Sequence, residues 1–130
     1  MAKVLVVEDN ATNMKLAVLL LETAGHTVIV ATDAEAGLTL ARDEQPHLIL
    51  MDVQLPGMDG LEATTMLKKD QATRAIPVIA LTALAMKGDE ERIRAAGCDG
   101  YIAKPMSYQE FLATVATQLT HDGAASGRKA

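Results

Sequence analysis

Residues 48–60, LILMDVQLPGMDG, set an acidic side chain at the end of an apolar segment, and this stretch decides how the chain folds. Four apolar residues run without interruption to Asp52, and Pro56 and Gly57 then break the backbone. A short apolar run bounded by turn residues is typical of a strand that is buried on both faces of a parallel sheet. A carboxylate at the end of such a strand is unfavourable unless another group pairs with it or uses it, so Asp52 is a candidate functional residue.

Similar apolar runs recur along the chain and alternate with helical patterns. The predicted strands are residues 3–7, 27–31, 47–51, 77–81 and 101–103, and the predicted helices are residues 11–24, 34–43, 61–69, 86–96 and a segment that begins at a Ser107 cap. Strict alternation of strand and helix predicts an α/β fold with right-handed crossovers. Five strands favour the doubly wound five-stranded parallel sheet with the order 2-1-3-4-5, whose ligand site lies at the carboxyl ends of the first and third strands.

The residues that follow the predicted strands have the side chains of a metal and phosphate site. Those side chains are Glu8 and Asp9 after the first strand, Asp52 after the third, Thr82 after the fourth and Lys104 after the fifth. Three carboxylates against one ammonium leave an excess of negative charge, and so close a group resists full ionisation. A divalent cation removes this conflict. Oxygen ligands with open water positions favour Mg²⁺, which commonly serves a phosphate group.

The composition limits the classes of protein and partner. The chain has 130 residues, 49% of them hydrophobic, which suits one domain over residues 1–120 with a flexible tail at 121–130. The formal net charge is -5 and no basic stripe is present, so neither nucleic acid nor a membrane surface is an expected partner. Cys98 is the single cysteine and no apolar run reaches membrane-spanning length, so we expect a cytoplasmic protein without an internal disulfide.

Four short motifs occur together in an order and spacing that carry a family resemblance. They are VVEDN at residues 6–10, LMDVQLPGMDG at 50–60, ALTA at 80–83 and YIAKP at 101–105. With these motifs the chain resembles the receiver domains of two-component response regulators over nearly its whole length, which implies the (βα)5 flavodoxin-like receiver fold. The stretches EDNATNMK at 8–15 and AMKGDEERI at 85–93 are similar to those of DivK-type single-domain regulators.

The resemblance implies a phospho-acceptor and a Mg²⁺ site among the acidic residues. Asp52 matches the aspartate that accepts the phosphoryl group in this family. Asp9 and Asp52 match direct metal ligands, with the backbone carbonyl of Gln54 as a third. Glu8 stands where many relatives have Asp, and it matches a position that usually reaches the metal through water. No organic cofactor is implied.

The resemblance also implies a switch. Thr82 matches the switch hydroxyl, and Tyr101 matches the switch aromatic residue. Lys104 matches the lysine that pairs with the phosphoryl group, and Pro105 matches a proline that follows a cis peptide bond. Gln54 and Leu84, two residues beyond Asp52 and Thr82, are expected to border the phosphoryl group. Because Gln54 is neutral and Leu84 is apolar, neither can act as a strong base for an attacking water, so we expect slow self-dephosphorylation.

Taken together, the motifs imply a response regulator receiver that takes a phosphoryl group from a histidine kinase or a histidine phosphotransfer protein onto Asp52. It would be a signalling domain rather than an enzyme, catalysing only its own phosphorylation and dephosphorylation. Its output would be protein docking by the fourth helix, fifth strand and fifth helix, with a homodimer on phosphorylation. Gly88 costs the fourth helix roughly 1 kcal/mol relative to Ala, so a small energy can shift that helix. We expect a stand-alone regulator; the alternative is a receiver excised from a hybrid histidine kinase or a larger regulator.

Three other functions fit the pattern less well. A phosphatase of the haloacid-dehalogenase kind needs a second acid two residues after its nucleophile, and Gln54 cannot transfer a proton there. A flavodoxin-like nucleotide or flavin binder needs a first loop that binds phosphate, whereas residues 8–13, EDNATN, begin with two acids that repel it. A pseudo-receiver without phosphorylation is disfavoured because all five key positions are intact.

Overall fold

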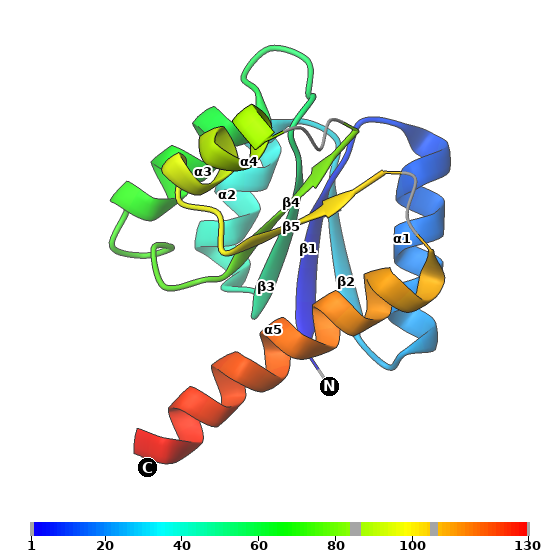
Figure 1. Cartoon of the computed structure of the whole chain (residues 1–130), viewed down its shortest axis with the longest axis vertical. Coiled ribbons are helices and arrows are strands. Elements are labelled where there is room, and N and C mark those ends of the chain that lie inside the picture. Colours follow the sequence, from blue (N-terminus) through cyan, green and yellow to red (C-terminus); the bar gives the residue numbers. More distant parts are fainter. Residues whose placement is uncertain (1, 84–86, 105–106, 130) are drawn as a thin grey trace.

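Five strands alternate with five helices in the computed structural model of the chain, which describes residues 2–83, 87–104 and 107–129 (Figure 1). The strands are β1 (Lys3–Val7), β2 (Thr27–Ala31), β3 (Leu48–Asp52), β4 (Val78–Thr82) and β5 (Gly100–Ala103). The helices are α1 (Ala11–Thr23), α2 (Ala34–Glu44), α3 (Gly60–Lys69), α4 (Lys87–Ala95) and α5 (Tyr108–Lys129). The alternation predicted from the apolar runs is confirmed.

The strands form one parallel sheet with the order β2-β1-β3-β4-β5, which confirms the predicted doubly wound topology. The winding of the chain reverses between β1 and β3, so the carboxyl ends of these two strands flank the switch point where such sheets bind ligands. The register sets Val7 opposite Met51 and Asp52 opposite Leu81. Glu8 and Asp52 therefore leave the sheet at the same level.

Helices cover both faces of the sheet, with α1 and α5 on one side and α2, α3 and α4 on the other (Figure 1). Alternate residues of the central strand serve the two layers. Leu48 and Leu50 pack in the core shared with α1 and α5, and Ile49 and Met51 pack in the core shared with α2 and α3. Burial on both faces explains why this strand reads as a continuous apolar run.

Two strands end one residue later than the apolar runs predict. β3 ends at Asp52 and β4 ends at Thr82. The backbone of Asp52 still pairs with Leu81, and that of Thr82 pairs with Ala103. These two polar side chains therefore project from the last residue of a strand, which is held by the sheet, and not from the following loop.

Side-chain caps fix where four of the helices begin. In each case the side chain accepts the backbone N–H three residues on, at 2.8 to 3.0 Å, and the four caps are Asn10, Asp33, Asp59 and Ser107. The cap at Ser107 is the one that the sequence analysis names, and Asp33 directly precedes the helix predicted over residues 34–43. Asn10 and Asp59, which lie in the acidic loops, also cap helices with their side chains. They do so because the first N–H groups of a helix need an acceptor.

Glycines with a positive φ follow two of the helices, and the last helix runs on into the predicted tail. Gly25 follows α1 with a φ of 94°, and Gly97 follows α4 with a φ of 102°, a conformation that favours glycine. α5 runs to Lys129 and so passes through most of the stretch predicted as a flexible tail at 121–130. The division into a domain over 1–120 and a tail stays a prediction. None of the helices in the described part of the chain has the length and apolar character needed to cross a bilayer.

Candidate functional site

Three charged side chains meet at the carboxyl ends of β1, β3 and β5. The ammonium nitrogen of Lys104 lies 2.9 Å from Glu8 Oε1 and 3.3 Å from Asp52 Oδ2. Glu8 is 2% exposed and Asp52 is 5% exposed, so both carboxylates are almost removed from bulk water. The topology thus joins residues that lie as far as 96 positions apart in the sequence.

Both carboxylate oxygens of Glu8 have partners, one after β5 and one in the turn after β1. Oε1 contacts Lys104, and Oε2 accepts the backbone N–H of Asn10 at 3.3 Å. The backbone N–H of Glu8 donates to the carbonyl of Ala31 at 3.0 Å, so this residue continues the attachment of β1 to β2. Asp9, the next residue, is exposed. The buried acid is therefore tied to protein groups, while the exposed acid keeps access to solvent.

The loop after β3 orients the carboxylate of Asp52. The backbone N–H of Gln54 donates to Asp52 Oδ1 at 3.1 Å, a local bond typical of turns that contain Asp. Gly60 opens α3 and donates its N–H to the carbonyl of Val53 at 3.0 Å. A Cβ atom at Gly60 would lie 2.0 Å from the carbonyl oxygen of Asp52, so a side chain cannot be placed there without displacing the strand end.

Glu8, Asp9 and Asp52 together form an acidic cluster that could hold a metal ion. Each offers one carboxylate oxygen, and these oxygens lie within 4.8 Å of one another. The cluster opens into a hollow of about 650 Å³, whose lining includes Asn13 and Gln54. Oxygen donors with access to water fit a hard divalent cation rather than a soft one.

Crowding of the carboxylates changes their ionisation. Burial, together with the hydrogen bond and the charge of Glu8, raises the pKa of Asp52 to about 7, although Lys104 opposes the rise. Burial also disfavours the ionised form of Glu8, but hydrogen bonds with Asp52 and Lys104 outweigh it and lower the pKa of Glu8. Burial acts against the charge of Lys104 as well, yet its two carboxylate partners raise the pKa of Lys104. Without a cation, Asp52 is therefore the acid of this pair that takes up a proton as the pH falls toward neutral.

The two predicted switch residues lie in different surroundings. Thr82 is 4% exposed, and its carbonyl accepts the backbone N–H of Lys104 at 2.7 Å, which keeps the ends of β4 and β5 together beside the charged cluster. Tyr101 is half-buried, and its hydroxyl donates to the carboxylate of Glu90 on α4. This hydrogen bond raises the pKa of Tyr101. The ring hydroxyl is thus directed to α4 in this structure.

One contributor to the site is absent from the sequence-based set, and two predicted positions are not described. Asn10 caps α1 with its side chain and holds Glu8 with its backbone N–H. Its signal in the sequence is an Asn directly before a helical pattern, which indicates a cap but not the contact with Glu8. Leu84 and Pro105 lie outside the described residues.

Comparisons with known proteins agree with one another. The response regulator receiver domain matches residues 4–116 of the chain. The polar-differentiation response regulator DivK of Brucella ovis is 53% identical over 116 residues, which cover 89% of this chain and 94% of that protein. A solved receiver domain of a sensor histidine kinase from Pseudomonas aeruginosa, with a magnesium ion coordinated in its active site cleft, is 33% identical with a TM-score of 0.85, covering 92% of this chain and 98% of that chain. Chemotaxis protein CheY4 of Vibrio cholerae is 27% identical with a TM-score of 0.86, covering 90% and 98%.

Proposed function

This chain belongs to the response regulator receiver domain family of two-component signalling, and we propose that it acts by accepting a phosphoryl group on Asp52. The donor is a histidine kinase or a histidine phosphotransfer protein. The observation that carries the proposal is the contact of Asp52 with Lys104 inside an acidic cluster that opens to solvent. An ion pair that only stabilised the fold would need neither the exposed Asp9 nor the opening, whereas a phospho-acceptor needs both.

The charged residues have separate tasks in the proposed transfer. A carboxylate oxygen of Asp52 attacks the phosphorus in line, the bond from phosphorus to the donor's histidine nitrogen breaks, and that nitrogen keeps the electron pair. The product is an acyl phosphate on Asp52. Lys104, which pairs with the free Asp52 carboxylate, then pairs with a phosphoryl oxygen.

We assign the acidic cluster to Mg²⁺. Asp9, Asp52 and the backbone carbonyl of Gln54 would hold the ion, which when bound neutralises charge on the phosphoryl group and the carboxylates. Glu8 already uses one carboxylate oxygen for Lys104 and the other for a backbone N–H, so it would reach the ion through water. The similar receiver domain from Pseudomonas aeruginosa, which has a coordinated magnesium ion, supports the assignment.

Protein docking is the proposed output. Thr82 turns its hydroxyl toward a phosphoryl oxygen, and Tyr101 moves into the space beside it. That movement breaks the hydrogen bond from Tyr101 to Glu90 and loosens α4 from β5. A Cβ atom at Gly88, near the start of α4, would meet no atom of a neighbouring element within 4 Å, so Gly88 is not wedged against the rest of the fold. The face made by α4, β5 and α5 then binds a downstream protein or, on phosphorylation, a second copy of the chain.

We propose that the chain is a single-domain regulator, as its DivK relatives are. The matched segment covers 94% of the Brucella ovis DivK chain, which favours a single-domain regulator of that kind over a receiver excised from a hybrid kinase. Its only catalysis is its own phosphorylation and dephosphorylation, in the cytoplasm. A net charge of -5 supports proteins rather than nucleic acid as partners.

A phosphorylation assay with matched Asn variants tests the proposal. Incubation with acetyl phosphate and Mg²⁺ should add one phosphoryl group to the wild type and none to Asp52→Asn. Asp59→Asn is the control, because Asp59 lies in the loop after the same strand and Asn preserves its cap on α3. Labelling of the Asp52 variant at the wild-type level would rule out this acceptor.

A further inference from the structure

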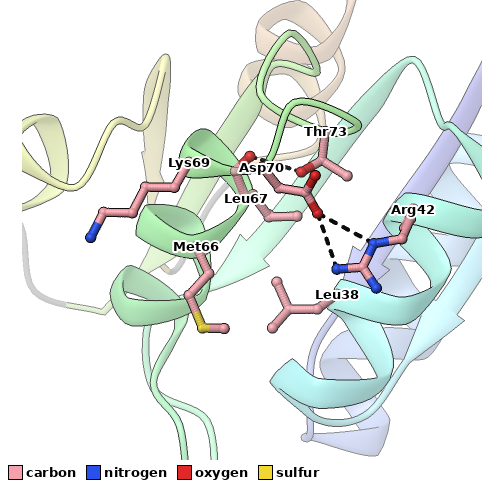
Figure 2. Close-up of a pocket in the computed structure, with 7 residues that line it drawn as sticks. All are labelled: Leu38, Arg42, Met66, Leu67, Lys69, Asp70 and Thr73. Atoms are coloured by element: carbon pink, nitrogen blue, oxygen red, sulfur yellow. Dashed lines mark hydrogen bonds and ion pairs between the residues drawn. The ribbon is translucent and has the colours of Figure 1, made fainter.

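A groove between α2 and α3 lies apart from the acidic site and is lined mainly by apolar atoms (Figure 2). Leu38 of α2 and Met66 of α3 face it from its two sides, and its volume is about 330 Å³. Met66 is 48% exposed, although it is one of the larger apolar side chains of the protein. Both helices end near the amino edge of the sheet, and none of the residues that line the groove belongs to the lining of the acidic hollow.

An ion pair closes the end of the groove at which the two helices end. Arg42 donates from Nε and Nη2 to Asp70 Oδ2 at 3.3 and 3.0 Å, the two contacts drawn between these residues in Figure 2. The side-chain amide of Gln45 also donates to the carbonyl of Ala72 at 2.9 Å. These bonds fix the spacing of α2 and α3, so the groove is preformed.

The two helices carry the same order of side chains along this surface, an acid, an apolar residue and then a cation. The two sets are Glu35, Leu38 and Arg42 on α2, and Glu62, Met66 and Lys69 on α3. Within each set, successive residues are three or four positions apart and the first and last are seven apart, which places them along one side of a helix. The face formed by the two helices therefore has acids near their first turns, the apolar groove in the middle and cations near their last turns. Neither acid lines the groove itself, and Lys69 extends away from Arg42 on the other side of α3 (Figure 2).

The charges at the basic end are not fully compensated. Asp70 pairs with Arg42, which leaves Lys69 without an ion pair among the described residues. No cation of the described chain pairs with Glu35 or Glu62 at the acidic end either. Opposite charges thus stand unpaired at the two ends of one apolar surface.

A surface of this kind is complementary to a copy of itself turned by 180°. A two-fold axis across the middle of the groove sets Glu62 of each copy opposite Lys69 of the other and brings the two Met66 side chains together. A parallel arrangement would instead set like charges against each other. We propose that a second copy of this chain docks on the groove between α2 and α3 and forms a two-fold symmetric dimer.

The size and place of the surface determine how such a dimer should behave. Stable interfaces bury roughly 1,200 Å² or more, and a face two short helices wide falls at the low end of that scale, so association should be weak and reversible. The pairs of charges are exposed, so salt should weaken it further. The groove shares no lining residue with the hollow at Asp52, so the dimer should form without phosphorylation, unlike the dimer proposed for the face of α4, β5 and α5.

Charge exchange in the full chain tests this arrangement by sedimentation equilibrium at rising protein concentration and low salt. Glu62→Lys and Lys69→Glu each set like charges opposite one another in the homodimer, and each should weaken self-association by about tenfold. Mixed in equal amounts, the two variants carry lysines on one copy and glutamates on the other. The mixture should regain the wild-type affinity.

Lys15→Glu is the matched control, because Lys15 is an exposed residue of α1 and this change alters the net charge as much as Lys69→Glu does. It should leave the association within about twofold of the wild type, and beryllofluoride should leave the same dimer in place. Three results would overturn the proposal. The chain could stay monomeric at a concentration of about 1 mM, the order of the dissociation constants of weak complexes. Lys15→Glu could weaken association as much as the groove variants do, or the mixture of the two variants could fail to regain the wild-type affinity. Binding of a different protein in the groove of a monomeric chain would overturn it as well.

Discussion

Replacement of Asp52 by Asn should stabilise the metal-free fold at neutral and alkaline pH. Asp52 is 5% exposed and lies beside Glu8, a carboxylate that keeps its charge more readily than usual. These surroundings raise the pKa of Asp52 from 3.8 to about 7 in the folded chain. Asn removes the charge, keeps nearly the same shape and can still accept the backbone N–H of Gln54.

The size of the effect follows from that rise in pKa. A rise from 3.8 to about 7 corresponds to a free energy of unfolding lower by about 4 kcal/mol once Asp52 is fully ionised. Lys104 and Glu8 readjust and water enters the hollow, so we expect a gain of about 2 kcal/mol for the variant. Because the pKa is higher in the folded chain, the stability contributed by the protonated form is fully present below about pH 4 and is lost as the pH rises to about 7.

Urea unfolding followed by circular dichroism in the presence of EDTA measures this difference. The two proteins should be equally stable near pH 4, and Asp52→Asn should be more stable by about 2 kcal/mol near pH 8. Millimolar Mg²⁺ should narrow the gap, since it binds the wild type more tightly. Equal stabilities near pH 8, or a gap that is the same at both pH values, would refute the reasoning from crowded carboxylates.

Three further substitutions test the metal site, the loop after β3 and the contact between β5 and α4. Asp9→Asn should weaken Mg²⁺ binding about tenfold more than Glu8→Gln, because of these two acids only Asp9 is proposed as a direct ligand. Calorimetry that shows equal losses would contradict this order. Gly60→Ala should lower the free energy of unfolding by about 3 kcal/mol in urea titrations, since its Cβ would lie 2.0 Å from a backbone carbonyl oxygen of β3. A loss below about 1 kcal/mol would mean that the loop can adjust to the added Cβ with little strain. Tyr101→Phe removes the bond to Glu90 and should speed amide exchange in α4, so unchanged exchange would exclude a restraint by that bond.

The sheet could be predicted because burial on both faces leaves a direct mark on the sequence. β1, β3 and β4 can place few polar side chains on either face, so they appear as continuous apolar runs. Asp52 and Thr82 fall outside those runs, yet both belong to strands. The backbone of each of these two residues pairs with the neighbouring strand. The pattern of apolar side chains does not indicate where backbone pairing ends.

The members of the site could be predicted, but their individual environments could not. Parallel strands bring their carboxyl ends to one edge, and this rule is enough to expect Glu8, Asp52 and Lys104 near one another. Which of two adjacent acids is buried depends on the direction of the turn after β1. The bond from Tyr101 to α4 depends on how a helix with few apolar residues packs, so neither detail has a local signal.

Localisation of the phosphoryl group within the chain is the most direct test of Asp52 as its acceptor. After incubation with acetyl phosphate and Mg²⁺, borohydride reduces an aspartyl phosphate to homoserine, and tandem mass spectrometry identifies the residue that has changed. We expect conversion of Asp52 alone, in the peptide that contains LILMDVQLPGMDG. Conversion of Asp9 or Asp59 in its place, or a phosphorylated chain without any conversion at Asp52, would contradict it.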